Sequence, residues 1–108
     1  MTAVTVLAVY RPKPGKAEAL DRLVIEHLPI LRAEGLATDH PATVLKAADG
    51  TLVEIFEWVS QDAIDRAHAI PAVMALWARF AAACDYLPIA DLPEAKQMFS
   101  PFTRVVAA

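Results

Sequence analysis

Several residue types are scarce in this chain of 108 residues, and each scarcity removes a class of function. The single cysteine, Cys84, excludes an internal disulfide and a zinc site built from cysteines. We interpret it as a small buried hydrophobic residue rather than a reactive thiol. With only three glycines, the chain lacks a loop that could cradle a phosphate. The serines, Ser60 and Ser100, do not lie in a nucleophile elbow.

Clustered positive charge and long apolar runs are also missing. The net charge is −3, and the basic residues are scattered from Arg11 to Arg104, which argues against nucleic acid or an anionic membrane as a partner. No apolar run approaches the roughly 18 residues that span a bilayer. The first ten residues alternate like a strand and lack the basic segment of a signal peptide. We therefore expect a cytoplasmic protein.

Apolar residues, in contrast, are abundant and make up 56% of the chain. The length predicts one domain over residues 1–108, in which 91–108 form a C-terminal arm. So high an apolar fraction predicts more hydrophobic surface than one small monomer can bury. We therefore expect the protein to associate with itself as a homodimer.

The hydrophobic pattern predicts strands and helices in the order β-α-β-β-α-β. Apolar β-branched runs indicate strands, and apolar residues at the 3.6-residue period indicate helices. Pro29 lies inside the first helix and predicts a kink or break near 25–28. Asp49 and Gly50 predict a tight hairpin. The expected strands are 3–11, 38–47, 51–59 and 86–90, and the expected helices are 16–34, 60–69 and a further one that begins at Pro71.

This order predicts an α+β fold of the ferredoxin-like type, with both helical regions on one face of an antiparallel sheet. The first and third strands are nevertheless apolar on both faces. The uncovered face is therefore expected to pack against the same face of a second copy. We expect the tail, with Met98, Phe99 and Phe102, to lie across that partner; the alternative is that it folds over its own sheet.

Four landmarks between residues 3 and 90 carry a resemblance to a known family. They are the turn at 14–16, which reads Pro-Gly-Lys, then Trp58 at a strand end, His68 ten residues later, and the apolar run from Pro71 to Phe80. In these features the chain resembles the antibiotic biosynthesis monooxygenase-like domains of the dimeric α/β-barrel superfamily, within an uncharacterised bacterial subgroup.

The chain departs from the family pattern next to the tryptophan. Two residues before the tryptophan, where many members carry a glutamate, this chain has Phe56. The nearest acids are Glu54 and Glu57, which the strand pattern puts on opposite faces.

The resemblance implies oxygenation of a small electron-rich aromatic molecule, such as a quinol, without a metal, flavin or other cofactor. In such a scheme the protein removes a proton and the substrate anion itself reduces oxygen. The site then needs a base, polar anchors and a dry aromatic pocket. Two alternatives remain at this stage: a non-catalytic homodimer that binds a small apolar ligand, and a relative that binds or degrades haem.

The three histidines are the candidate bases, because imidazole titrates near neutral pH. His27 lies on the apolar stripe of the first helix, and we place it with His68 as the catalytic candidates. The structural alternatives are that His27 bonds a free carbonyl near the Pro29 kink and that His68 ties down a helix end. His40 is a possible substrate contact. The spacing of the three fits no helical metal motif, so no metal is expected.

Five aromatic residues complete the candidate site. Tyr10 and Tyr86 are expected to anchor a ligand through their hydroxyls, and Trp58, Trp77 and Phe80 are expected to form the walls of its pocket. The alternative for all five is a purely structural role in the core.

Overall fold

The structure is a computed structural model that describes residues 2–105. Its centre is a five-stranded antiparallel sheet in the order β4-β1-β3-β2-β5, so that the long strands β1 and β3 lie together in the middle. The strands are β1 (Val4–Pro12), β2 (Thr43–Lys46), β3 (Leu52–Trp58), β4 (Cys84–Leu87) and β5 (Thr103–Arg104).

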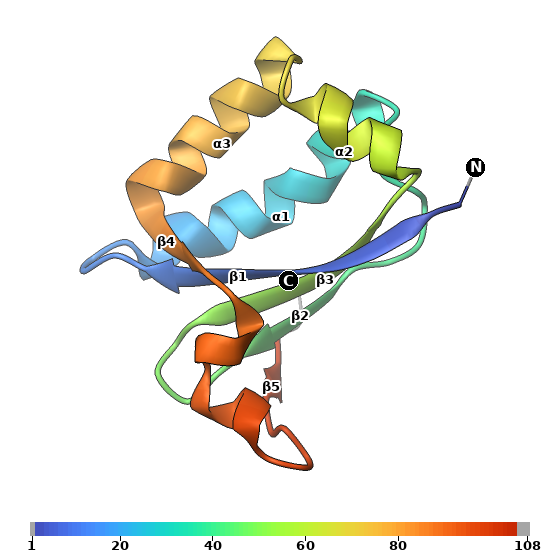
Figure 1. Ribbon diagram of the computed structural model, residues 1–108. Coiled ribbons are helices and arrows are strands. Elements are labelled where there is room, and N and C mark those ends of the chain that lie inside the picture. The colour runs from blue at the N-terminus through green and yellow to red at the C-terminus, as the bar shows by residue number, and fades with distance from the viewer. Residues whose placement is uncertain (1, 106–108) are drawn as a thin grey trace.

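Three helices, α1 (Ala17–Ala33), α2 (Gln61–Ala67) and α3 (Pro71–Ala83), cover one face of the sheet. The C-terminal segment lies below the other face and contains two short 3₁₀ turns, η1 (Ile89–Asp91) and η2 (Pro93–Lys96) (Figure 1). The expected β-α-β-β-α-β order and the ferredoxin-like α+β fold are confirmed. Within residues 2–105, no helix is both long enough and apolar enough to cross a membrane.

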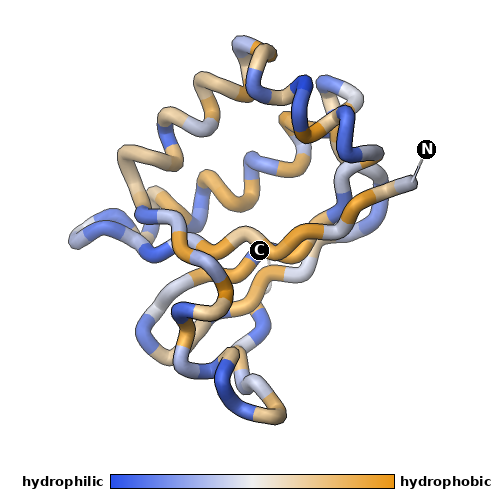
Figure 2. The backbone as a smooth tube through the Cα atoms, in the orientation of Figure 1, coloured by the Kyte–Doolittle hydropathy of each residue, from blue (hydrophilic) through white to orange (hydrophobic). Residues whose placement is uncertain are grey.

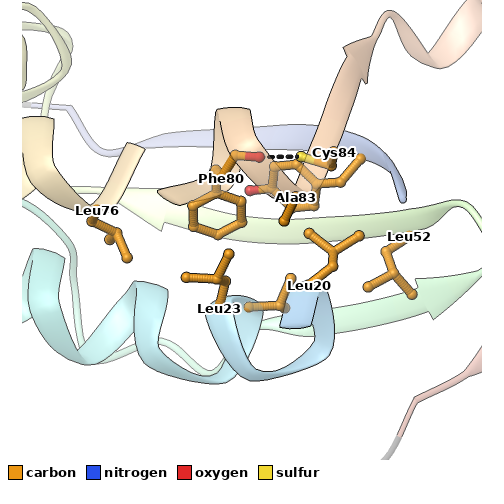
Figure 3. Close-up of a cluster of buried hydrophobic side chains, with 9 residues drawn as sticks. Leu20, Leu23, Leu52, Leu76, Phe80, Ala83 and Cys84 are labelled. Atoms are coloured by element: carbon orange, nitrogen blue, oxygen red, sulfur yellow. Dashed lines mark hydrogen bonds between the residues drawn. The ribbon is translucent and has the colours of Figure 1, made fainter. Parts of the chain in front are cut away.

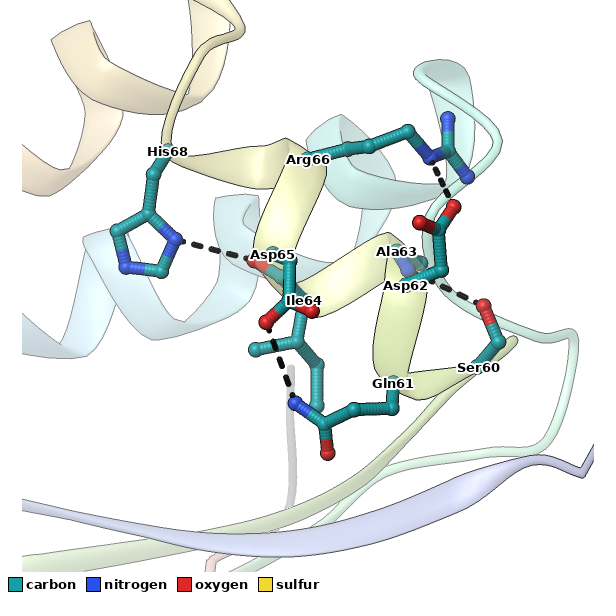
Figure 4. Close-up of polar contacts among 8 residues, drawn as sticks. All are labelled: Ser60, Gln61, Asp62, Ala63, Ile64, Asp65, Arg66 and His68. Atoms are coloured by element: carbon teal, nitrogen blue, oxygen red, sulfur yellow. Dashed lines mark hydrogen bonds and ion pairs between the residues drawn. The ribbon is translucent and has the colours of Figure 1, made fainter.

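Local sequence signals account for most element boundaries. Gly50 adopts a positive φ of 93°, and the N–H of Thr51 donates to Oδ1 of Asp49, which forms the expected hairpin between β2 and β3. Ser60 caps α2 by accepting the N–H of Ala63, as Figure 4 shows. The helix α3 begins at Pro71, a favoured first position.

The expected break in the first helix is wrong, because α1 is continuous from Ala17 to Ala33 with Pro29 inside it. Two strand boundaries also differ. The second strand covers only 43–46 and not the expected 38–47. Pro41 has no backbone N–H to donate to a neighbouring strand, which keeps the strand from starting earlier. The fourth strand is 84–87, so that Cys84 begins a strand and is not part of the preceding helix.

Hydrophobic clusters form on both faces of the sheet, as the apolar strands in Figure 2 suggest. On the helix side, residues of α1 and α3 pack against the sheet around Phe80 (Figure 3). On the opposite side, Val9 and Val53 pack against Leu92 of the C-terminal segment. The C-terminal segment of the same chain therefore covers part of the second apolar face of β1 and β3.

The C-terminal segment lies on its own sheet, which was the alternative interpretation of the tail. Leu92 is fully buried, and the Glu94 carboxylate accepts the N–H of Ala48 at 2.8 Å. Phe102 packs partly against the same cluster, whereas Met98 and Phe99 are 92% and 85% exposed. The segment thus covers one end of the second face and leaves a stretch near the middle of β1 open.

Candidate functional site

A buried polar triad lies between α1 and the sheet. Oε1 of Glu54 accepts a hydrogen bond from the Tyr10 hydroxyl at 2.7 Å and lies 2.8 Å from Nδ1 of His27. The three side chains are nearly inaccessible, with His27 3% and Glu54 1% exposed. Buried polar groups persist when they satisfy one another, and here one oxygen serves two partners.

Strand register and helix periodicity bring these residues together. Glu54 on β3 lies opposite Ala8 on β1, and Tyr10 is two residues farther along on the same face of the sheet. His27 belongs to the buried stripe of α1, which packs over that face. The triad therefore joins residues from β1, α1 and β3: His27 follows Tyr10 by 17 residues and precedes Glu54 by 27. It forms only when α1 packs on the sheet.

The tyrosine of the triad is held in its neutral form. Burial is the main cause that raises the pKa of Tyr10 far above its ordinary value, and the nearby Glu54 charge raises it further. The hydroxyl therefore remains a proton donor toward the carboxylate. Burial also raises the pKa of Tyr86, to about 12. Neither tyrosine ionises near neutral pH.

A cavity of about 410 Å³ opens beside the triad. This volume is at the small end of the range of roughly 300–1,000 Å³ that is typical of ligand pockets. The walls are mostly aromatic and aliphatic, and the polar side chains among them are histidine and tyrosine. The cavity is lined by Val6, Leu7, Ala8, Tyr10, His27, Phe56, Trp58, Trp77, Phe80 and Tyr86.

His27 lines the cavity, and one of its two ring nitrogens has no partner in the triad. Glu54 faces Nδ1 and does not line the cavity, which leaves Nε2 unengaged. Nε2 is buried and has no hydrogen-bond partner among the described residues. The rings of Phe56 and Phe80 contact the imidazole edge-on, each with a centroid distance of 5.1 Å. An unpaired buried polar atom in an apolar wall is the strongest indication of a ligand site in this structure.

The structure brings six of the eight expected site residues to this one cavity. They are Tyr10, His27, Trp58, Trp77, Phe80 and Tyr86. His27 does not bond a free carbonyl near Pro29, as the structural alternative supposed, because its Nδ1 faces the Glu54 carboxylate.

The other two expected residues lie elsewhere. His68 caps the C-terminus of α2, is exposed, and places Nδ1 3.1 Å from the carbonyl of Ile64 (Figure 4). Its ring contacts Trp77, at 5.1 Å between centroids, but does not line the cavity. His40 is exposed, and its backbone N–H and carbonyl bond Thr38 and Arg32.

Sequence reasoning missed Glu54, the residue that joins the triad. A signal was present, because Glu54 shares the inner face of its strand with Leu52, Phe56 and Trp58. An acid on an otherwise apolar face needs a buried partner, and His27 on the inner stripe of the helix was available. Glu54 also lines a second cavity of about 610 Å³ between α1 and the β2–β5 edge of the sheet.

Across residues 2–105, no three histidine, cysteine or carboxylate side chains gather as a metal-binding group. His27 and Glu54 face each other, and the third member of their cluster is a neutral tyrosine hydroxyl.

The chain is similar in structure to two solved proteins. One is the Rv0793 protein from Mycobacterium tuberculosis, with a TM-score of 0.61 and 23% identity over 85% of this chain and 99% of that one. The other is the NE2512 protein of unknown function from Nitrosomonas europaea, with a TM-score of 0.57 and 23% identity over 86% and 96% of the two chains. These likenesses support the fold alone. No family model and no curated protein matches the chain.

Proposed function

We propose that the protein is a cofactor-independent monooxygenase-like enzyme that oxidises a small hydroxyl-bearing aromatic molecule of the quinol type in the 410 Å³ cavity. The observation that carries the proposal is the unpaired Nε2 of His27 in an aromatic wall. The Glu54 carboxylate holds Nδ1 of His27, which leaves Nε2 to act as a general base. The apolar walls exclude water from the anion that forms.

The reaction uses molecular oxygen as the oxidant. Nε2 of His27 takes the hydroxyl proton, and the resulting anion transfers electrons to oxygen. A ring C–H carbon then gains one oxygen atom and the ring system loses two hydrogen atoms. Those hydrogens leave with the second oxygen atom as water, so atoms and electrons balance without a metal or flavin. In this scheme Tyr86 at the cavity wall anchors a second oxygen of the substrate.

Oxygen uptake with a panel of quinols and naphthols tests the proposal. His27→Gln keeps an amide that can donate to Glu54 but removes the base, and we expect the rate to fall by about 100-fold or more. His68→Gln is the matched control, because His68 lies outside the cavity, and its rate should equal that of the wild type. Equal rates in wild type and His27→Gln would contradict the role of His27.

A binding protein without catalysis is the second candidate, because most of the cavity lining is apolar. It predicts that quinols quench the fluorescence of Trp58 and Trp77 without consuming oxygen. In a haem-binding relative, His27 would instead be the residue that holds the haem iron. Titration with haem and inspection of its absorption band separate that outcome, and His27→Gln should abolish any such shift.

Self-association belongs to the same proposal. Leu7 borders the cavity, but on β1 it alternates with Ala8 and lies opposite Ile55, which packs on the face away from the helices. It is 52% exposed. An exposed apolar position there favours packing of two copies sheet to sheet. Sedimentation should give twice the monomer mass, and Leu7→Lys should give the monomer. Met74→Lys on α3 is the control and should leave the mass unchanged. A monomeric wild type would contradict the dimer.

A further inference from the structure

The second cavity, of about 610 Å³, lies between α1 and the β2–β5 edge of the sheet. Its lining shares no residue with the cavity beside His27 and includes none from α2 or α3. The volume lies within the range of roughly 300–1,000 Å³ that is typical of sites for small molecules. This space is therefore separate from the one that the proposed oxidation uses.

Apolar side chains form most of the walls of the second cavity. Val24, Ile25 and Leu28 contribute from α1, and Val44 and Leu52 contribute from the sheet. Ile25 is 57% exposed although it is apolar. A ligand with an apolar body would remove this surface from water, which favours binding.

Glu54 is the buried acid in this lining, and it is 1% exposed. Its contacts with the Tyr10 hydroxyl and with Nδ1 of His27 both use Oε1. Oε2 makes no hydrogen bond among the described residues, but unlike the unpaired Nε2 of His27 it is not fully enclosed. Glu54 lines the second cavity and not the first, so a ligand can reach Oε2 from there. A carboxylate oxygen in such a site needs a donor.

Three more charged residues line the cavity, namely Asp21, Arg32 and Arg104. Asp21 is exposed on α1 and adds a second negative charge. The guanidinium of Arg32 is held by two backbone carbonyls in the segment after α1, at 2.8 and 2.9 Å. Arg104 lies opposite Leu45, which packs on the far face of the sheet, so the side chain of Arg104 is directed to that face. The charge offered to a ligand is therefore mainly negative.

We infer that the second cavity binds a small apolar molecule that carries a primary amine. The ammonium group donates to Oε2 of Glu54, and the apolar body packs between Ile25 on α1 and Val44 on β2. Val44 lies directly opposite Glu54 in the β2–β3 register, so the charged and apolar contacts are adjacent. An alcohol of the same shape would make a weaker hydrogen bond, and a carboxylate would be repelled.

A matched series of ligands tests the chemical class. Calorimetry near neutral pH should compare 2-phenylethylamine, 2-phenylethanol and 3-phenylpropanoate, which share one apolar body. The amine should bind about tenfold more tightly than the alcohol, as expected for a hydrogen bond with charged partners, and the acid should bind most weakly. Equal affinities for amine and alcohol, tighter binding of the acid, or no binding of the amine would overturn the inference.

Two charges introduced at Ile25 test the location. The position is exposed, so neither variant disturbs the core. Ile25→Lys should weaken amine binding about threefold, and Ile25→Glu should strengthen it by a similar factor. Met74→Lys on α3, outside both cavities, is the matched control and should leave the affinity unchanged. An equal effect of lysine at positions 25 and 74 would remove the amine from this cavity.

Two further variants separate the cavities and test the carboxylate. Tyr86→Ala alters the first cavity outside the triad and should leave amine binding unchanged; a tenfold loss would place the amine there instead. Glu54→Gln removes the charge, and the ratio of amine to alcohol affinity should fall toward one. An unchanged ratio in the folded variant would overturn the role of Glu54, and if this variant does not fold, the Ile25 pair still decides. Oxygen uptake reports on the first cavity alone, so the proposed function and the amine site can each fail separately.

Discussion

The carboxylate of Glu54 lies 2.8 Å from the imidazole of His27, although 27 residues separate them and neither is accessible to solvent. The pair joins the middle of the sheet to the inner face of α1. Removing one partner of such a contact leaves the other unpaired in a region of low dielectric constant, which costs more than the hydrogen bond itself. The same contact therefore affects both stability and the chemistry of the cavity.

The Tyr10 hydroxyl is expected to stabilise the fold through Glu54. Tyr10→Phe leaves the buried carboxylate with one partner fewer, and the free energy of unfolding should fall by about 1–3 kcal/mol. Tyr86→Phe is the control, because Tyr86 is 54% exposed, and its effect should stay within about 0.5 kcal/mol. Urea unfolding measures both. Equal losses in the two variants would contradict a special role for Tyr10.

The cap of α2 is expected to stabilise the short helix that precedes α3. Ser60→Ala deletes the oxygen that accepts the Ala63 N–H at 3.1 Å, and the loss should be about 1 kcal/mol. Ser60→Asp keeps an acceptor and should preserve most of the stability. Ser100→Ala, at an exposed position, should be close to neutral. A Ser60→Ala variant as stable as Ser100→Ala would show that the cap contributes little.

Cys84 is expected to be unreactive in the folded protein. Its thiol is buried and donates to the Phe80 carbonyl at 3.1 Å (Figure 3). Burial raises the pKa of the Cys84 thiol from 9.0 to about 11, so little thiolate exists at pH 8. A disulfide reagent should label the native protein slowly and the urea-unfolded protein rapidly, with one equivalent per chain. Rapid labelling without urea would contradict the burial of this residue.

The same thiol predicts a loss of stability at alkaline pH. Because the pKa is higher in the folded state than in the unfolded state, the unfolded chain releases its proton first. This contribution is fully present below pH 9 and is lost as the pH rises from about 9 to 11. In Cys84→Ala the unfolding free energy should decline less steeply over that window. Denaturant titrations at several pH values measure the slope, and equal slopes would exclude the thiol as the cause.

Local sequence patterns are enough to predict the order of the helices and strands and most of the residues that line the cavity. Periodicity of apolar residues decides which face of a helix or strand is buried, and this is a local property of the chain. This periodicity predicts that Tyr10, Trp58, Trp77 and Phe80 point inward and that His27 lies on the inner stripe of its helix. In the structure all five residues line the cavity. The hairpin at Gly50 followed from local turn chemistry in the same way.

Which polar groups contact one another depends on how the elements pack in three dimensions. The partnership of Glu54 with His27 and Tyr10, the exclusion of His40 and His68 from the cavity, and the position of the C-terminal segment on its own sheet all depend on how elements dock. Periodicity specifies a face, but it carries no information about which residue of another element lies opposite. That choice follows from packing and hydrogen-bond satisfaction over long sequence separations, which no local pattern records.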